Sequence, residues 1–539
     1  MGIPDRVWTY VALGIVFAIS VARSLHLGFP LERDEGEFGY IAQQLLHGVP
    51  VYVSAHTQKL PGTYVAYAFA LALFGQSPTA IHLGLMFANA LIMGFLFLIL
   101  RKTHSAPAGC AGALVFGVMA MSPNVVGFAA HATFYVTLFA IAGIYVYLLA
   151  RERGRMALFL ISGLCFGAAL LMKQSGIFFA PVPLLSLVLD RPSGEPSGSN
   201  RVLRRAVAFT AGALTPFVLT LVYYTAIGEL STFWFWAFQF AGEFAGQTGA
   251  ADAARNFTVR TREVLAGFQL LWILGLTGLI LAGRDWIHRK GLVLFPAFAI
   301  ASVVSVLPGL FFTNHYFVPV LAAIALLIGA WGGTPMRDRG RAESRSGRWI
   351  PAAVWALTGL GLLIGVAQFG GYYLAKESDA DISHWVYHGN PFPESVEIGD
   401  SLRRDTTTRD QIAMLGSETQ ILFYAQRRSA SPYVNTYFLR QSRAMQHEMI
   451  REIERARPKY IVFVRLPMSW SFFRSSPSDI FDWFEKYRGA YRLEGVLLMD
   501  GDRRVLRWGE DALAQKLTPD RIEILRRVET GTATDLLAP

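Results

Sequence analysis

Ionisable residues crowd into the stretch from Leu31 to Gly62, which lies between two long apolar segments. Asp34, Glu35 and Glu37 form its acidic part, and Lys59 stands near its end. A carboxylate held at the boundary between membrane and water can act as a general base. An ammonium group can bind a lipid phosphate and stabilise it as it leaves. The residue types therefore predict a reaction that handles a proton and a phosphate.

Each of these groups also has a purely structural interpretation. Asp34 is a candidate helix N-cap, with Glu37 three residues later as in a capping box. Gly36 would allow a tight turn after Glu35. Lys59 could be an interfacial lysine whose stem lies along apolar surface. Capping and catalysis by neighbouring members of the cluster are compatible.

Further polar residues interrupt the apolar part of the chain. Lys173 and Gln174 follow an apolar run, where a charge at membrane depth usually marks a function; a boundary position at an outer turn is the alternative. His315 and Tyr316 stand at the outer end of two spans, and His131 precedes another. A structural histidine and an interfacial tyrosine are the alternatives for these residues.

Several kinds of chemistry have no motif in this sequence. It contains no Walker loop, no GxGxxG and no His/Cys metal spacing. We therefore predict no metal and no certain cofactor, although a divalent metal is chemically possible. Cys110 and Cys165 lie in apolar runs and are interpreted as packing residues. The net charge of +10 is assigned to arginines beside apolar segments, not to a nucleic-acid surface.

The elements that must position these groups are membrane spans. Of the 539 residues 53% are hydrophobic, which indicates a polytopic α-helical membrane protein. About eleven apolar runs have the length of a span, at 7–28, 79–100, 106–122, 132–150, 156–172, 175–190, 206–228, 267–283, 291–311, 316–333 and 350–371. The first is predicted to be an uncleaved span. The run 63–75 is too short to cross and is predicted to lie at the membrane surface.

Basic residues orient these spans, because cytoplasmic loops are rich in Lys and Arg. The clusters that define the cytoplasmic side include Arg101 and Lys102, then Arg151, Arg153 and Arg155. The acidic stretch, within an outer loop at 29–78, then lies outside. The loop 229–266 also lies outside, with an aromatic cluster at its start and a mobile part at 242–254. A flexible cytoplasmic linker is predicted at 192–200.

After about residue 380 the pattern changes to that of a small α/β domain, predicted over 380–510 on the outer side. Short buried strands are predicted at 411–414, 421–424 and 460–464, with helices at 441–455 and 479–487. A hairpin is predicted over 491–508. Residues 511–539 read as a charged C-terminal tail, helical in part, and 1–371 as the transmembrane domain.

The motif Arg33-Asp34-Glu35-Gly36-Glu37 after a first span, followed by Gln58-Lys59-Leu60-Pro61-Gly62, resembles the glycosyltransferase 39/83-like group. This group has the GT-C membrane fold and includes protein O-mannosyltransferases and the lipid A aminoarabinose transferase. Lys173-Gln174 and His315-Tyr316-Phe317 are similar to motifs of its bacterial branch. The resemblance covers roughly residues 1–371.

The resemblance implies a donor sugar carried on a polyprenyl phosphate and a displacement with inversion. Asp34 matches the base of the family, Glu35 the neighbouring acid, and Lys59 the lysine that contacts the lipid phosphate. We assign Lys173 to the donor phosphate as well. Seven residues are assigned to substrate binding: Arg33, Glu37, Gln58, His131, Gln174, His315 and Tyr316.

Two positions depart from the family pattern. Leu60 replaces a proline, and Ala130-His131-Ala132 stands where many relatives carry a second acidic residue. The prediction is a glycosyltransferase of the bacterial inner membrane with its site on the periplasmic side. Its acceptor is a protein, lipid A, or another envelope glycan or lipid, and membrane lipids surround it. The alternatives are a transporter or lipid flippase without transfer activity, and an envelope-assembly scaffold.

Overall fold

The computed structural model describes residues 4–190, 199–289, 293–333, 346–374, 377–501 and 503–528. These residues form two compact units. The helical unit contains residues 1–28, 58–66 and 79–377, and the α/β unit contains residues 29–57, 67–78 and 378–539. The two segments 29–57 and 67–78 were grouped with the transmembrane part in the sequence analysis. The predicted linker at 192–200 falls largely outside the described residues.

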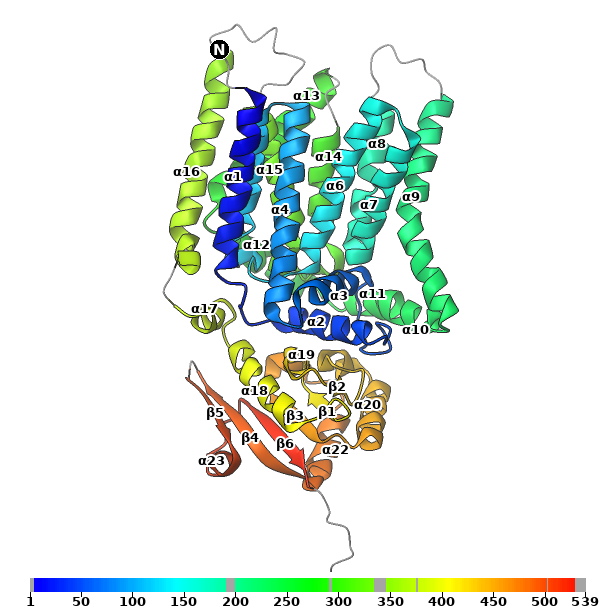
Figure 1. Ribbon diagram of the computed structural model, residues 1–539, viewed down its shortest axis with the longest axis vertical. Coiled ribbons are helices and arrows are strands. Elements are labelled where there is room, and N and C mark those ends of the chain that lie inside the picture. The colour runs from blue at the N-terminus through cyan, green and yellow to red at the C-terminus, as the bar shows by residue number, and fades with distance from the viewer. Residues whose placement is uncertain are drawn as a thin grey trace, which may run out of the picture. The chain divides into compact units, whose positions relative to one another are not determined.

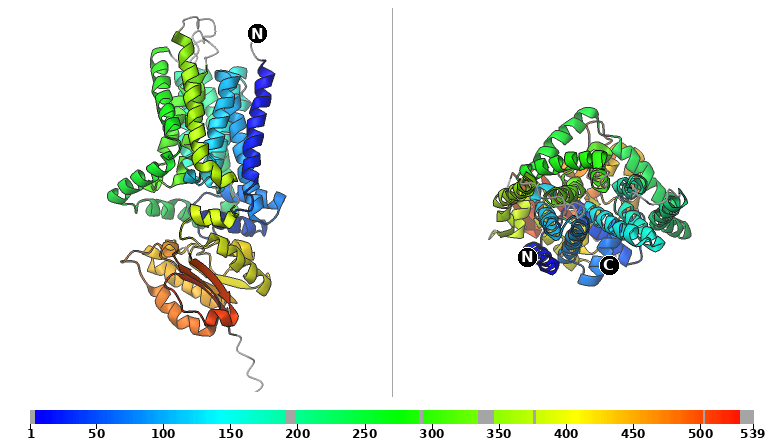
Figure 2. Two further views of the ribbon diagram at one scale, coloured as in Figure 1. Left: turned by 90° about the vertical axis from the view of Figure 1, so that its left-hand side faces the viewer. Right: turned by 90° about the horizontal axis from the view of Figure 1, so that it is seen from above.

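Long helices that run side by side make up the helical unit (Figures 1 and 2). Each of the eleven predicted spans overlaps one of the helices of this unit. These helices are α1 (Asp5–Ser24), α4 (Pro78–Thr103), α5 (Ala106–Met119), α6 (Ala132–Arg153), α7 (Met156–Met172), α8 (Pro181–Leu189), α9 (Ser199–Ala226), α13 (Gln269–Arg289), α14 (Leu294–Val304), α15 (Val318–Gly332) and α16 (Ser346–Leu374). Helices α8 and α14 cover only about half of the predicted runs 175–190 and 291–311.

Six of the described helices are long and apolar enough to cross a membrane, or up to seven if α12 (Ala250–Leu265) and α13, a bent pair, form one span. The pair bends by 105°. Helices α5, α7 and α14 are apolar but shorter, as is the broken segment Gln174–Leu189. The number of eleven spans therefore stays a prediction. Helix α3 (Gly62–Phe74) occupies the predicted short run 63–75 and begins directly after Pro61.

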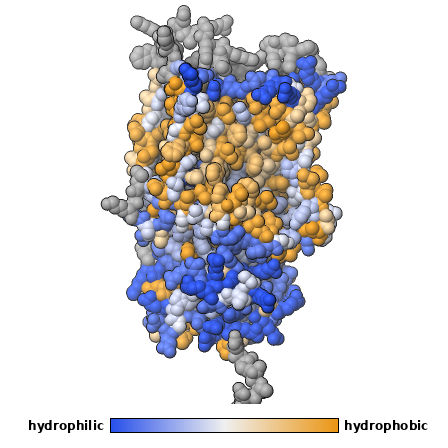
Figure 3. Space-filling view, in the orientation of Figure 1, coloured by the Kyte–Doolittle hydropathy of each residue, from blue (hydrophilic) through white to orange (hydrophobic). Residues whose placement is uncertain are grey.

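The flank of the helical unit is apolar. On the face shown in Figure 3 hydrophobic residues cover most of its helices. Phe17 on α1 is 70% exposed and Leu363 on α16 is 69% exposed, which is the surface expected of helices that face lipid. Large side chains on the inward faces are fully buried, among them Phe116, Phe134 and Tyr147.

One end of the helical unit carries basic residues. The Arg101 guanidinium, at the end of α4, lies 3.8 Å from the carboxylate of Asp5 at the start of α1. Lys102 pairs with Glu152 at the end of α6. The ends of α4 and α6 and the start of α1 thus share one side, which is the predicted cytoplasmic side.

The predicted outer loop 229–266 is largely helical, in contrast to the expectation. It consists of α10 (Leu230–Trp234), a π-helix over Phe235–Phe240, α11 (Ala241–Ala245) and α12 (Ala250–Leu265). Trp236 and Phe240 are buried, so the aromatic cluster packs against its neighbours. The supposed mobile part, 242–254, includes most of α11 and the start of α12, because alanine at these positions favours helix.

A mixed sheet forms the centre of the α/β unit, in the strand order β2-β1-β3-β6-β4-β5. Strands β1, β2 and β3 are parallel, and β6, β4 and β5 continue the sheet in antiparallel pairs. The strands are β1 (Gln411–Leu415), β2 (Arg428–Ser429), β3 (Tyr460–Arg465), β4 (Tyr491–Asp500), β5 (Arg503–Trp508) and β6 (Arg521–Arg527). The chain reaches the sheet through α17 (Asp379–Val386) and α18 (Phe392–Asp405). Further helices of this unit include α20 (Arg443–Ala456), α21 (Pro467–Trp470), α22 (Asp479–Tyr487) and α23 (Gly509–Leu513).

Two predictions for this unit were wrong. Residues 421–424 lie in helix α19 (Gln420–Ala425), not in a strand. A short apolar run without alternation fits either element, so its pattern alone did not decide. The supposed tail contains strand β6, which lies between β3 and β4. The predicted hairpin over 491–508 and the helices near 441–455 and 479–487 are confirmed.

Candidate functional site

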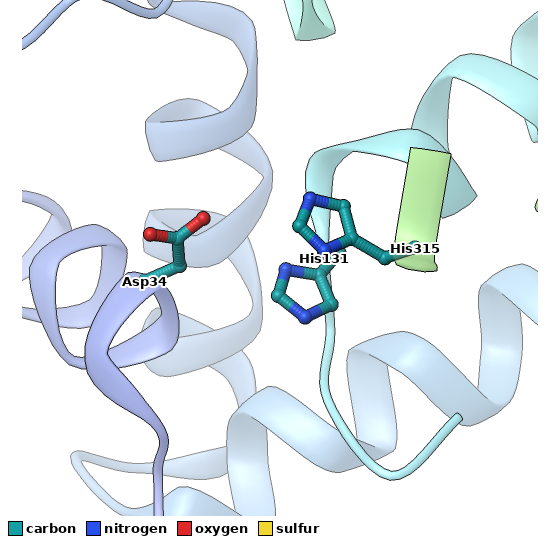
Figure 4. Close-up of side chains that lie close together, drawn as sticks. All are labelled: Asp34, His131 and His315. Carbon is teal, nitrogen blue, oxygen red and sulfur yellow. The ribbon is translucent and has the colours of Figure 1, made fainter. Parts of the chain in front are cut away.

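His131 and His315 form a stacked pair within the helical unit. Their ring centroids lie 3.7 Å apart with an interplanar angle of 8°, and both side chains are buried (Figure 4). His131 precedes the first residue of α6, and His315 lies in the short 3-10 helix Asn314–Phe317 before α15. The hydroxyl of Thr133 donates a 2.8 Å hydrogen bond to the His315 carbonyl and joins the two helix starts.

Lys173 lies beside this histidine pair. It ends α7 with an extended backbone, and its Nζ stands 3.1 Å from the centroid of the Tyr316 ring. The Tyr316 ring in turn contacts the His315 ring edge-to-face, with centroids 4.9 Å apart. An ammonium over an aromatic face is stabilised by the ring quadrupole. The predicted residues Lys173, His315, Tyr316 and His131 therefore meet in one cluster.

Lys59 is brought to the same cluster by bonds between its own segment and that of Lys173. The Gln174 amide donates to the carbonyl of Gln58 at 2.6 Å and to that of Ala237 at 3.1 Å. The Thr63 hydroxyl donates to the Met172 carbonyl at 2.7 Å. Both lysines lie within electrostatic range of His315. We name Lys59, Lys173, His131, His315 and Tyr316 the cationic cluster.

Close backbone approach explains the glycine at position 62. A Cβ there would lie 2.7 Å from the carbonyl carbon and oxygen of Leu171. Glycine therefore allows the start of α3 to lie against the end of α7. The sequence contains no local signal for this contact, and Thr63 and Thr133 were not predicted as site residues.

The charge of the cationic cluster determines which ligand it fits. His131 and His315 offer imidazole nitrogens, which are common metal ligands. Two ammonium groups within electrostatic range of His315 add positive charge at this place. The same ammonium groups favour an anion such as a phosphate.

In the α/β unit, α2 (Arg33–Leu46) carries the predicted acidic residues, and Asp34 projects from its first turn (Figure 4). The N-cap is Glu32, whose carboxylate accepts from the Glu35 amide at 2.8 Å, and Glu35 Oε2 lies 3.5 Å from the Glu32 amide. The expected cap by Asp34 with Glu37 was wrong, because Glu32 supplies the capping carboxylate two residues earlier. Burial, with the carboxylates of Asp34 and Glu35, holds the pKa of Glu32 well above its usual range.

Arg33 and Glu37 are engaged inside the α/β unit. The Arg33 guanidinium pairs with Glu418 at 2.8 Å and donates to the Ser417 carbonyl at 3.1 Å. Glu37 is buried and accepts from Asn435 at 2.6 Å and from Thr57 at 2.5 Å. Both side chains hold α2 to residues of the C-terminal sequence. Their predicted role in substrate binding stays a prediction.

Comparisons with known proteins confirm the predicted resemblance. Residues 58–224, about a third of the chain, match the family described as dolichyl-phosphate-mannose-protein mannosyltransferase. The match begins at Gln58 and includes Lys59, His131, Lys173 and Gln174. Comparison with curated protein sequences finds no significant match.

Solved structures show the same fold. ArnT from Cupriavidus metallidurans in the apo state is 16% identical, with a TM-score of 0.57 over 96% of this chain and 97% of that chain. The same protein bound to undecaprenyl phosphate gives a TM-score of 0.53 at 16% identity, over 93% of this chain and 97% of that chain. The oligosaccharyltransferase AglB from Archaeoglobus fulgidus, in complex with an inhibitory peptide and a dolichol-phosphate, gives 0.51 at 14% identity, over 96% and 76%. The chain thus has the predicted GT-C fold with a small C-terminal sheet domain.

Proposed function

We propose that this protein is a GT-C glycosyltransferase that moves a sugar from a polyprenyl phosphate to an acceptor outside the cytoplasm. The observation that carries the proposal is the cationic cluster, in which Lys59 and Lys173, from separate segments, both lie within electrostatic range of His315. Ammonium groups close to one imidazole attract an anion such as a phosphate. A lipid phosphate supplies that anion.

The family match and the solved structures support this donor. The matching family is described as using dolichyl phosphate mannose. The structures of ArnT and AglB hold undecaprenyl phosphate and dolichol-phosphate respectively. A donor of the same chemical class fits the apolar flank of the helical unit, since its tail dissolves in the membrane.

The orientation of the helical unit supports an extracytoplasmic site. The basic residues Arg101 and Lys102 lie in the last turn of α4, and Arg151 and Arg153 lie in the last turn of α6. His131, in the cationic cluster, stands at the opposite end of α6. With the basic ends in the cytoplasm, the cluster faces the other side, which is the periplasm in the bacterial inner membrane.

In the proposed reaction Asp34 accepts the proton of the acceptor hydroxyl. The acceptor oxygen forms a bond to the anomeric carbon, and the bond from that carbon to the phosphate oxygen breaks. The lipid phosphate leaves with the electron pair, and Lys59 and Lys173 stabilise its increasing charge. One displacement of this kind inverts the anomeric configuration. The acceptor is a glycan, lipid or protein, and the sugar a hexose or a pentose.

The cap of α2 supports Asp34 as the base. Glu32 and Glu35 form the capping box, so the carboxylate of Asp34 is not used as the N-cap. Asp34 is half-buried, whereas Glu35 is 1% exposed. Glu35 is therefore assigned to holding the first turn of α2 in place.

Purified protein and polyprenyl-phosphate sugars test the proposal. The enzyme is given one of two donors, undecaprenyl-phosphate mannose or undecaprenyl-phosphate aminoarabinose. Envelope extracts supply the acceptors, and transfer of the sugar is followed by mass spectrometry. We expect the parent protein to form product with one of the donors. The Asp34→Asn variant should form no product, although its melting temperature should equal that of the parent protein. Glu397→Gln, at an exposed carboxylate of α18, is the control and should keep full activity. Full transfer by Asp34→Asn would remove Asp34 from the mechanism.

A further inference from the structure

The α/β unit contains a polar pocket that the proposed chemistry does not use. Its cavity has a volume of about 460 Å³, within the range of small-molecule sites. Three segments form it: the last turns of α2 with the loop that follows, the edge of the sheet at β2 with the start of β1, and the end of α20. We call it the α2–α20 pocket; its polar lining residues are Tyr40, Gln44, Ser54, Gln411, Arg428, Ser429, Ser431, Glu452 and Arg455.

Two hydroxyl groups in this pocket have unused hydrogen-bonding capacity. Tyr40 is 2% exposed, and its oxygen accepts from the Ser429 amide at 2.9 Å. Among the described residues no acceptor receives the Tyr40 hydroxyl proton, and burial raises its pKa to about 12, so the proton stays on. The Ser54 Oγ is buried and also has no partner within the described ranges. Buried hydroxyls of this kind are normally satisfied, so they point to a ligand with hydroxyl or other oxygen groups.

The charges in the pocket favour an anion. Arg428 and Arg455 are exposed along its wall, and neither forms an ion pair with any residue that the structure describes. The carboxylate of Glu452 accepts from the Ser431 hydroxyl at 2.6 Å, and burial raises its pKa. A guanidinium pair opposed by one hydrogen-bonded carboxylate selects a phosphate or carboxylate group.

The edge of the sheet argues against a peptide at this place. A peptide would add a strand beside β2, which is the edge strand and has only two residues. The amide of Ser429 in this strand already donates to Tyr40. Little backbone is therefore left for pairing with a bound strand.

Helix α2 relates the pocket to the candidate base. Asp34 lies in its first turn, and Tyr40 and Gln44 line the pocket from its later turns. Ten residues of helix separate Asp34 from Gln44, a rise of about 15 Å. A molecule that reaches both ends of α2 must be longer than one monosaccharide.

We propose that the α2–α20 pocket binds an anionic sugar, carrying phosphate or carboxylate, of an extended glycan acceptor. That this glycan is the acceptor rests on the proposed transfer reaction. Binding of the anionic sugar to the pocket does not depend on that reaction. The anionic group lies between Arg428 and Arg455, and the sugar hydroxyls accept from Tyr40 and Ser54. The pocket thereby selects long, charged glycans and holds their other end near the start of α2.

Binding to the full chain in detergent, without donor, tests the pocket. The probes are trehalose 6-phosphate, trehalose, inorganic phosphate and a phosphoserine peptide, measured by calorimetry. We expect trehalose 6-phosphate to bind more tightly than the other three. Arg428→Gln and Arg455→Gln should each weaken it about 10-fold, the size of one lost charge-assisted hydrogen bond. Tyr40→Phe should weaken both sugars, and Arg451→Gln, exposed on α20 outside the pocket, should change nothing.

Each other result overturns the inference. Equal affinity for inorganic phosphate and trehalose 6-phosphate would leave an anion site without sugar recognition. Tighter binding of the phosphoserine peptide would assign the pocket to a peptide. Unchanged binding in both arginine variants would show that the α2–α20 pocket is not the binding site. Asp34→Asn should keep the binding, so a failure of the transfer reaction is separated from a failure of the pocket.

Discussion

Asn435 donates a 2.6 Å hydrogen bond to the buried carboxylate of Glu37, from a position 398 residues further along the sequence. The second oxygen of Glu37 accepts from the Thr57 hydroxyl. Glu37 thus joins helix α2, the end of the loop that follows it, and the C-terminal sequence. Because Thr57 directly precedes Gln58 and Lys59, this bond fixes the chain two residues before the lysine of the cationic cluster.

Removing a donor from Glu37 should destabilise the protein. Asn435→Ala leaves a buried carboxylate with one fewer partner, at a cost of about 1–3 kcal/mol. We expect a lower melting temperature for Asn435→Ala, followed by tryptophan fluorescence in detergent. Thr57→Val should act through the same carboxylate, so the double variant should lose less than the sum of the two. Strict additivity would show that the two bonds are independent.

Gln174 is expected to act on the reaction through Lys59. Its amide holds the carbonyls of Gln58 and Ala237, so Gln174→Ala frees the segment that carries the lysine. We expect kcat/KM for the lipid donor to fall about 10-fold, with most of the change in KM. Gln269→Ala, at an exposed position of α13, is the matched control.

A double variant separates positioning from simple destabilisation. In the Lys59→Met background the lysine is gone, so Gln174→Ala should reduce kcat/KM little further. A full additional 10-fold loss in that background would mean that Gln174 acts independently of Lys59. The melting temperatures of all four proteins are measured alongside.

The helices of the membrane part could be predicted from the sequence, because the length of each apolar run indicates the length of a helix. The sequence did not predict which polar residues meet. His131 and His315 stack because α6 and α15 begin at the same level, and Thr133 joins them. Such a pairing depends on tertiary structure and leaves no local pattern. Each residue of the cationic cluster was therefore identified alone, by its chemistry or by the family motif.

Strand β6 shows why a central element was missed. Glu523 lies in the middle of this strand and is fully buried, a position that sequence patterns assign to apolar residues. Its carboxylate is compensated by Arg465, Arg488 and Arg521, at 3.1, 2.9 and 2.8 Å respectively. Arg521 belongs to the same strand, but Arg465 and Arg488 come from other elements, and their contact with Glu523 cannot be inferred from the order of charges along the chain. The strand was therefore interpreted as part of a charged tail.

Gly36 should not tolerate a side chain. A Cβ at this position would lie 2.5 Å from the backbone nitrogen and Cα of Gln420, where α2 meets α19. In an open helix Gly→Ala stabilises by up to about 1 kcal/mol, whereas overpacking costs about 1–3 kcal/mol. We expect Gly36→Ala to lower the melting temperature. Gly14→Ala, with nothing within 4 Å of the added Cβ, should leave it unchanged or raise it; a rise in both would contradict the close contact.

His56 should make the protein less stable in mild acid. Burial lowers its pKa from 6.5 to about 3, and its ring packs edge-to-face on Tyr433. Between these values the unfolded chain binds a proton that the folded chain does not, so stability is complete above pH 6.5 and falls below it. The slope is about 1.4 kcal/mol per pH unit for one such group. His56→Gln should flatten the dependence of the melting temperature on pH between 6.5 and 4, whereas His47→Gln, at an exposed histidine, should leave the slope as in the parent protein. The same slope in both variants would mean that acid acts through another group.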